Sequence, residues 1–143
     1  LDKYTGDGMM VLFGAPLEQP DHAERAVRAA LGMQAAAVTL GQRRSGEQET
    51  VSYGIGIATG LAVAGHIGST SRLEYSAIGD TVNLAARLEG KAPPEAVLIS
   101  LATYEAVKGI VIADELEPTM VKGKELPVTV YRVRGLREEA RRE

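Results

Sequence analysis

Apolar and polar residues alternate along this chain in a way that predicts short strands interrupted by three helices. The mixed runs 1–4 and 9–13 flank Gly6-Asp7-Gly8, a pattern typical of a β-hairpin with a tight turn. Residues 21–44 then carry apolar residues at helical spacing, beginning with a capping residue and ending with arginine. The residues concerned are Asp21 as the cap, Arg43 or Arg44 as the end, and Ala26, Val27, Ala30, Leu31, Met33 and Leu40 as the apolar side.

The middle of the chain begins with three strand-like segments. In residues 51–59, bulky apolar residues alternate with small ones, which is typical of a strand. Residues 61–67 follow with little room for more than a turn, so we expect these two segments to form a second hairpin. Residues 72–78 are expected to form a further short strand.

A change to helical periodicity follows this strand. We expect a helix from Asp80, as its N-cap, to about Gly90, as its terminator. Asn83 and Arg87 are four residues apart on it and would therefore share one face.

The remaining segments predict three strands and one short helix. A strand at 97–99 leads into a helix that Ser100 caps and that reaches Lys108. Strands are also expected at 110–113 and 128–133.

These elements together favour an α+β fold, with a ferredoxin-like, largely antiparallel sheet and helices packed on it. The length of 143 residues fits one domain of ordinary size. We expect this domain to span residues 1–135 and to be followed by a charged, frayed tail over 136–143.

Composition excludes several classes of function. The chain has no cysteine, which excludes a disulfide scaffold, a cysteine-ligated zinc site and a thiol nucleophile. Its net charge of −3 lacks the positive excess of a general nucleic-acid binder. No apolar run approaches the roughly 20 residues that cross a bilayer. A cytoplasmic location is expected, while membrane attachment through segments outside this chain stays open.

Four residues are candidates for chemistry, each with an ordinary alternative. Asp7 suits a turn between glycines, but a carboxylate at a strand end also suits Mg²⁺ held together with substrate phosphates. Asn83 and Arg87 are compatible with a solvated helix face, or with an amide and a guanidinium binding ribose and phosphate. Lys122, beside Gly123, is either a turn lysine or a phosphate contact. The common phosphate-loop, dinucleotide and zinc-protease motifs are absent from the sequence.

Taken in order, these residues resemble the catalytic domain of the class III nucleotidyl cyclases, the family of adenylate and guanylate cyclases, and in particular its cyanobacterial-type adenylate cyclases. The resemblance runs from Leu1 to about Val133. It rests on the segments 3–8, 13–16, 21–23, 54–60, 78–89 and 121–124.

The resemblance implies a head-to-tail homodimer with two equivalent active sites in the groove between its subunits. Lys3 resembles the family's adenine-reading lysine, and Ser76 falls where cyanobacterial-type members carry threonine beside it. This pair points to ATP, because guanylate cyclases have an acidic residue and a small or thiol residue at these places. Ile78, at the start of the long matching segment, is placed with the substrate-binding residues.

The same resemblance assigns the residues around the ribose and the phosphates. Asn83 looks like the asparagine that orients the ribose, Arg87 like the arginine that stabilises the transition state, and Lys122 like the lysine that contacts the triphosphate. Asp7, supplied by the opposite subunit, looks like one of two aspartates that bind a pair of Mg²⁺ or Mn²⁺ ions. The implied reaction converts ATP to 3′,5′-cyclic AMP and pyrophosphate in intracellular signalling.

The family's other metal aspartate lies on a first strand that this sequence does not include. We therefore expect the chain to be a fragment of a longer protein with an upstream regulatory domain, and to be inactive alone. Two alternatives stay open: a non-catalytic, cyclase-like dimerisation or regulatory module, and a guanylate cyclase.

Overall fold

The computed structural model describes six segments of the chain. They are residues 3–5, 8–14, 18–43, 53–67, 74–118 and 127–140, with the backbone alone at 3–5, 40–43, 63–67, 74–77 and 139–140. Asp7 and Lys122 lie outside these segments.

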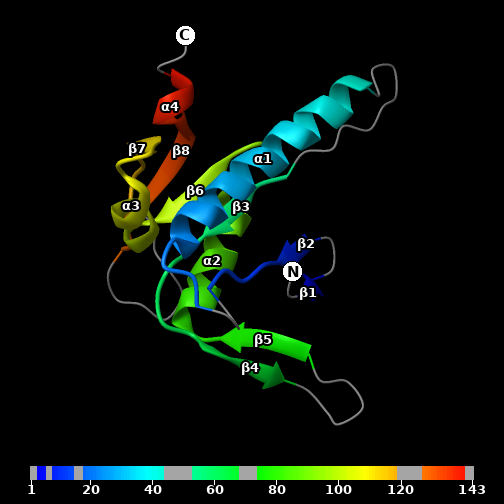
Figure 1. Ribbon diagram of the computed structural model, residues 1–143, viewed down its shortest axis with the longest axis vertical. Coiled ribbons are helices and arrows are strands. Elements are labelled where there is room, and N and C mark those ends of the chain that lie inside the picture. The colour runs from blue at the N-terminus through cyan, green and yellow to red at the C-terminus, as the bar shows by residue number, and fades with distance from the viewer. Residues whose placement is uncertain are drawn as a thin grey trace.

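A four-stranded mixed sheet forms the centre of the structure (Figure 1). Its strands are β3 (Ile55–Ile57), β6 (Val97–Ser100), β8 (Val130–Leu136) and β7 (Val111–Glu115), in that spatial order. β3 pairs parallel with β6, whereas β8 pairs antiparallel with both β6 and β7. The predicted α+β class is confirmed, and the strand ends in the second half of the chain lie within three residues of their predicted positions.

The expected second hairpin is wrong. β3 pairs with β6, while β4 (Val63–Ile67) pairs antiparallel with β5 (Glu74–Ile78) in a separate two-stranded ribbon. The strand that the alternation of large and small residues predicts is confirmed as β3: Ile55 and Ile57 pack into the main core, whereas a Cβ on Gly56 would lie 2.3 Å from the Glu89 nitrogen. The small residue therefore allows a helix to approach the strand closely. The short gap before residues 61–67, from which the hairpin is predicted, does not determine the partner of β3.

Helices cover both faces of the sheet, as Figure 1 shows. α1 (His22–Arg43) and α3 (Leu101–Val107) lie on one face, and α2 (Asp80–Lys91) lies on the other. β6 is buried on both sides: Val97 and Ile99 join the cluster under α1 and α3, and Leu98 joins the cluster under α2. None of the helices in the described segments is long and apolar enough to cross a membrane.

The apolar side predicted for α1 is partly confirmed. Val27 and Ala30 are buried, while Ala26, Leu31 and Met33 are half-buried and the side chain of Leu40 lies outside the description. Ala23, Gln34 and Ala37 are buried as well. Gln34 is tolerated inside because its Nε2 donates hydrogen bonds to the Tyr53 and Ala96 carbonyls, at 2.9 and 3.0 Å.

The residues predicted to begin and end helices are only partly confirmed. Ser100 caps α3 by accepting a hydrogen bond from the Thr103 amide at 3.3 Å, as predicted. Asp80 is not the N-cap of α2, because Gly79 occupies that position without a side-chain hydrogen bond. Gly90 does not end this helix either: α2 continues to Lys91, and Ala92 is extended because it precedes Pro93.

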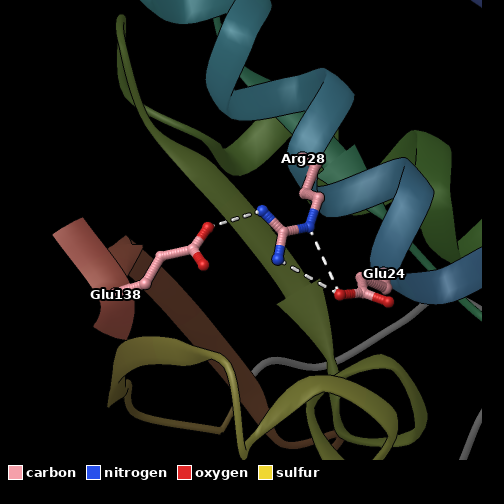
Figure 2. A network of polar contacts seen from close by, with 3 residues as sticks. All are labelled: Glu24, Arg28 and Glu138. Carbon is pink, nitrogen blue, oxygen red and sulfur yellow. Dashed lines mark hydrogen bonds and ion pairs between the residues drawn. The ribbon is translucent and has the colours of Figure 1, made fainter.

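The predicted frayed tail is wrong for residues 137–140, which form the short helix α4 (Arg137–Ala140). The Arg137 amide donates to the Ile110 carbonyl at 2.8 Å, which holds this helix against the turn before β7. Figure 2 shows Arg28 of α1 between two carboxylates, Glu24 and Glu138, at 3.2 and 2.9 Å. One charge at this end, that of Glu138, thus has a partner on α1, while Arg137 contacts the turn between α3 and β7.

Candidate functional site

The helix α2 has one buried face and one exposed face. Leu88 is fully buried and Leu84 packs against the same cluster, which also contains Leu98 and Val130 of the sheet. Asn83 and Arg87 are exposed. The predicted shared face is therefore confirmed, and it is turned away from the core. An amide and a permanently charged guanidinium one turn apart can bind neighbouring polar and anionic groups of one ligand.

Backbone contact holds α2 in place. A Cβ on Gly56 would meet the Glu89 nitrogen at 2.3 Å and the Ala85 oxygen at 2.5 Å, and a Cβ on Gly54 would meet Ala92 at 2.6 Å. Such distances are impossible for any residue larger than glycine without displacement of the helix. The glycines of this segment thus allow the backbone of β3 to contact α2 closely, and this contact sets the distance between α2 and the sheet.

A single glycine joins β5 to α2. Gly79 has φ +135° and ψ −179°, a conformation that only glycine adopts readily. Its carbonyl accepts a hydrogen bond from the backbone N–H of Asn83 at 3.0 Å, which leaves the Asn83 side chain out of this contact. Ile78, at the end of β5, is 57% exposed although it is a large apolar residue. Ser76 lies two residues before it and pairs with Gly65 in the β4–β5 ribbon. Strand, junction and helix therefore place Ser76, Ile78 and Asn83 along one continuous segment of the chain.

The N-terminal hairpin is confirmed as a pair of strands. β1 (Lys3–Thr5) pairs antiparallel with β2 (Gly8–Met10), so that Lys3 lies opposite Met10. β2 ends earlier than the predicted run to Phe13. The side chains of Lys3 and Ser76 are not described, and Asp7 and Lys122 lie outside the described residues, so their predicted roles stay predictions.

The described residues do not by themselves fit a metal centre. Within residues 3–5, 8–14, 18–43, 53–67, 74–118 and 127–140, no group of three or more His, Asp or Glu side chains is placed to share an ion. The predicted ligand Asp7 belongs to the part of the chain outside this search.

The clear pKa shifts in the described residues lie away from α2. The Arg25 guanidinium lowers the pKa of Asp21, and the hydrogen bonds that Arg28 donates to Glu138 and Glu24 raise the pKa of Arg28. Glu105 raises the pKa of Lys108, while partial burial, and then the hydrogen bond to Glu115, raise the pKa of Tyr131. These groups lie on or beside α1, α3 and β8, away from the exposed face of α2.

Thr81, near the exposed face of α2, was not predicted from the sequence. The hydroxyl of Thr81 donates to the Leu61 carbonyl at 2.7 Å and so connects the first turn of α2 with the segment before β4. Its partner is distant in sequence and is a backbone carbonyl, so no local sequence signal identifies it.

Known proteins of related sequence carry the same domain. A family profile described as the adenylate and guanylate cyclase catalytic domain matches residues 3–135. Adenylate cyclase 1 of Rhizobium meliloti (strain 1021) is 38% identical over 138 residues, covering 94% of this chain and 21% of that protein. An adenylate cyclase of Anabaena cylindrica is 32% identical over 146 residues, covering 94% of this chain and 28% of that protein. The chain thus spans between a fifth and a third of the length of these relatives.

Solved structures show the same fold. The guanylyl cyclase Cya2 is 38% identical, with a TM-score of 0.84 over 96% of this chain and 70% of that one. The adenylyl cyclase CyaB from P. aeruginosa is 32% identical, with a TM-score of 0.81 over 92% of this chain and 69% of that one. With the profile match over residues 3–135, these likenesses show that the chain belongs to the family of adenylate and guanylate cyclase catalytic domains.

Proposed function

We propose that this chain is the catalytic domain of an adenylate cyclase, which converts ATP to 3′,5′-cyclic AMP and pyrophosphate. The observation that carries the proposal is the geometry of α2, which exposes Asn83 and Arg87 one turn apart and continues directly from the strand that bears Ser76. Family membership gives the class of reaction, cyclisation of a nucleoside triphosphate. The choice of ATP rests on the pair Lys3 and Ser76 and on the adenylate cyclases among the relatives.

In this proposal Asn83 and Arg87 bind different parts of the substrate. The Asn83 amide orients the ribose so that its 3′ oxygen faces the α-phosphate. Arg87 binds the oxygens on which negative charge grows as the 3′ oxygen attacks and pyrophosphate leaves. Because a guanidinium stays protonated at any physiological pH, it serves this role without a proton transfer. A preorganised donor of this kind is worth about 3 to 4 kcal/mol of barrier.

Lys122, Ile78 and the adenine pair complete the proposed substrate site. Lys122 is assigned to the triphosphate, and the exposed Ile78 offers an apolar surface beside the base. Lys3 and Ser76 are assigned to the polar edge of adenine. Since β5 leads into α2 through Gly79 alone, a base held at Ser76 would lie close along the chain to a ribose held at Asn83.

Metal and dimer are the remaining parts of the proposal. The family uses divalent metals and works as dimers. We assign Asp7 as a ligand for Mg²⁺ or Mn²⁺, supplied by one subunit of a homodimer to the substrate site of the other. A divalent cation bound with the substrate would supply charge neutralisation on the phosphates and a lower pKa for the 3′ hydroxyl. The steps assigned above to this chain's own residues depend on Asn83 and Arg87.

The test is a cyclase assay on the full-length native protein, because this chain spans only a small part of its relatives. ATP or GTP would be supplied with Mn²⁺ and then Mg²⁺, and the products separated by chromatography. We expect cyclic AMP, with kcat/KM for ATP above that for GTP. Formation of neither cyclic nucleotide would contradict the proposal and favour a non-catalytic cyclase-like module.

A guanylate cyclase is the second candidate, because Cya2, a guanylyl cyclase by its description, is 38% identical. The substitution Lys3→Glu separates the two. If Lys3 reads adenine, this change lowers kcat/KM for ATP, and its matched control Lys108→Glu, at the residue that follows helix α3, does not. A native preference for GTP would decide for the second candidate.

A further inference from the structure

Thr81 makes a hydrogen bond that joins two elements with separate tasks. Its Oγ1 donates to the Leu61 carbonyl at 2.7 Å, a short and strong geometry for a hydroxyl donor. Leu61 lies in the segment that connects β3 to β4, while Thr81 lies in the first turn of α2. The contact is close on both sides, because a Cβ on Gly60 would lie 2.8 Å from the same Oγ1.

The bond closes the base of the β4–β5 ribbon. Val63 of β4 pairs with Ile78 of β5, and beyond this pair the two strands separate. The segment before Val63 comes from β3 of the main sheet, and the segment after Ile78 leads into α2. Leu61 lies two residues before Val63, and Thr81 lies three residues after Ile78. The hydrogen bond between Thr81 and Leu61 therefore continues the contact between the two strands into the first turn of α2. The N-cap residue Gly79 has no side chain to fix the helix start, and Thr81 supplies this missing connection.

We propose that Thr81 is a positioning residue for catalysis, which sets α2 with Asn83 and Arg87 relative to the ribbon that bears Ser76. This inference rests on the proposed function, since it concerns the alignment of a base held by β5 and a ribose and phosphate held by α2. Alignment errors of about 1 Å can cost a hundredfold in rate. The hydroxyl of Thr81 restrains such an error without touching the substrate.

A second threonine of the same chain provides the matched control. Thr39 likewise lies on a helix and donates its hydroxyl to a backbone carbonyl, that of Ala35 at 3.1 Å; it is exposed, whereas Thr81 is half-buried. Its partner belongs to the same helix, four residues earlier, and so connects no two elements. Removing this hydroxyl tests the general cost of a threonine-to-valine change, and removing that of Thr81 tests the connection.

The experiment compares Thr81→Val, Thr81→Ser and Thr39→Val in the full-length protein, by steady-state kinetics and by amide hydrogen exchange. We expect Thr81→Val to lower kcat about tenfold with KM within about twofold, because substrate still binds but is misaligned. Thr81→Ser, which keeps the hydroxyl, should restore kcat to within about twofold, and Thr39→Val should leave it unchanged. Exchange should increase in Thr81→Val at residues 80–84.

Each result bears on one proposal. A kcat for Thr81→Val equal to that of the wild type, a serine variant as poor as the valine variant, or an equal loss in Thr39→Val would overturn the positioning role and leave the cyclase proposal intact. If the wild type cyclises neither ATP nor GTP, the proposed function fails. Hydrogen exchange alone then decides the connection, and unchanged exchange at residues 80–84 would overturn it. Thr81→Ala replaces the valine variant if the latter does not fold.

Discussion

The two faces of the sheet are built differently. Under α1 and α3 lies a cluster of buried side chains from three strands and two helices, including Val27, Ile99 and Val111, all with no measurable exposure. Under α2 the cluster is smaller, centred on Leu88, and the helix is supported by glycine backbone at Gly56. The first face supplies stability through side-chain packing. The second holds one helix at a fixed height and leaves its polar face exposed, which suits a site.

This difference predicts separable effects of substitution. Changes on the exposed face of α2 should alter catalysis with little effect on folding, and changes under α1 and α3 should do the reverse. A change at the glycine support should affect both, because it displaces the helix that carries the site.

Arg87→Ala is expected to have the largest effect. Loss of the guanidinium should lower kcat by about a hundredfold to a thousandfold, which corresponds to about 2.7 to 4 kcal/mol of transition-state stabilisation. Since Arg87 is exposed, the midpoint of thermal unfolding should stay unchanged. Steady-state cyclic AMP formation and a melting curve of the full-length protein measure the two quantities.

The control for this substitution is Arg25→Ala, which removes an exposed arginine paired with Asp21 on α1. Its kcat should equal that of the wild type. An equal loss of kcat in both variants, or a large fall in the melting midpoint for Arg87→Ala, would contradict the assignment of catalysis to the α2 face.

Gly56→Ala is expected to be next, with effects on both folding and catalysis. Its new Cβ would collide with the Glu89 nitrogen and the Ala85 oxygen, so α2 must move away from β3. Such overpacking costs about 1 to 3 kcal/mol of unfolding free energy. Chemical denaturation measures this loss, and kcat of the folded protein should also fall.

A matched alanine change at Gly32 tests whether contact is the cause. Gly32 lies on α1, and an added Cβ there would meet nothing within 4 Å. Alanine at this helical position should be neutral or stabilising by about 1 kcal/mol. If Gly56→Ala behaved like Gly32→Ala, the close support of α2 by β3 would be refuted.

How far the sequence predicted these two faces depends on how local each signal is. Ser100 was identified as a cap because its partner, the Thr103 amide, is three residues away. The shared face of Asn83 and Arg87 followed from helical spacing. The second hairpin was predicted wrongly because it was inferred from the short gap between residues 51–59 and 61–67, whereas β3 pairs with β6, which comes much later in the sequence.

The remaining errors are also nonlocal. Gln34 could not be predicted as buried, because the carbonyls that accept its hydrogen bonds belong to Tyr53 and Ala96. Residues 137–140 were expected to fray, since a charged sequence does not reveal that Glu138 meets Arg28 of α1. The roles of Lys3, Ser76, Asp7 and Lys122 stay predictions, which follow from resemblance to the family and from no measured geometry.

Ile99→Val tests the other face and should have a moderate effect. Ile99 is fully buried among residues of α1, α3 and the sheet, so removal of one methylene group should cost about 1 kcal/mol of unfolding free energy. The kcat of the folded protein should not change. The matched control is Ile112→Val, at a strand position that is 37% exposed, where the cost should be smaller. A fall in kcat for Ile99→Val without loss of stability would remove the contrast between the faces.

Asp21→Asn should have the smallest effect on stability, and the size of this effect depends on pH. The hydrogen bond from Arg25 lowers the pKa of Asp21 below its ordinary value in the folded protein, so folding favours the charged carboxylate. This contribution is fully present above the unfolded pKa of about 3.9 and is lost as the pH falls through the lower folded value. The melting midpoint of the variant should therefore lie slightly below that of the wild type at pH 7, and the difference should vanish in strong acid.

The ion pair lies at the start of α1, on the face assigned to stability, so cyclase activity near neutral pH should not change in Asp21→Asn. Arg25→Gln should reproduce the small loss at pH 7, and Asp21→Asn should add nothing to it in the double variant, because the same interaction is removed once. A difference between wild type and Asp21→Asn that persisted below the folded pKa would show that the side chain acts through contacts other than this pair. A loss of activity would show that the start of α1 also affects the α2 site, across the sheet that otherwise separates them.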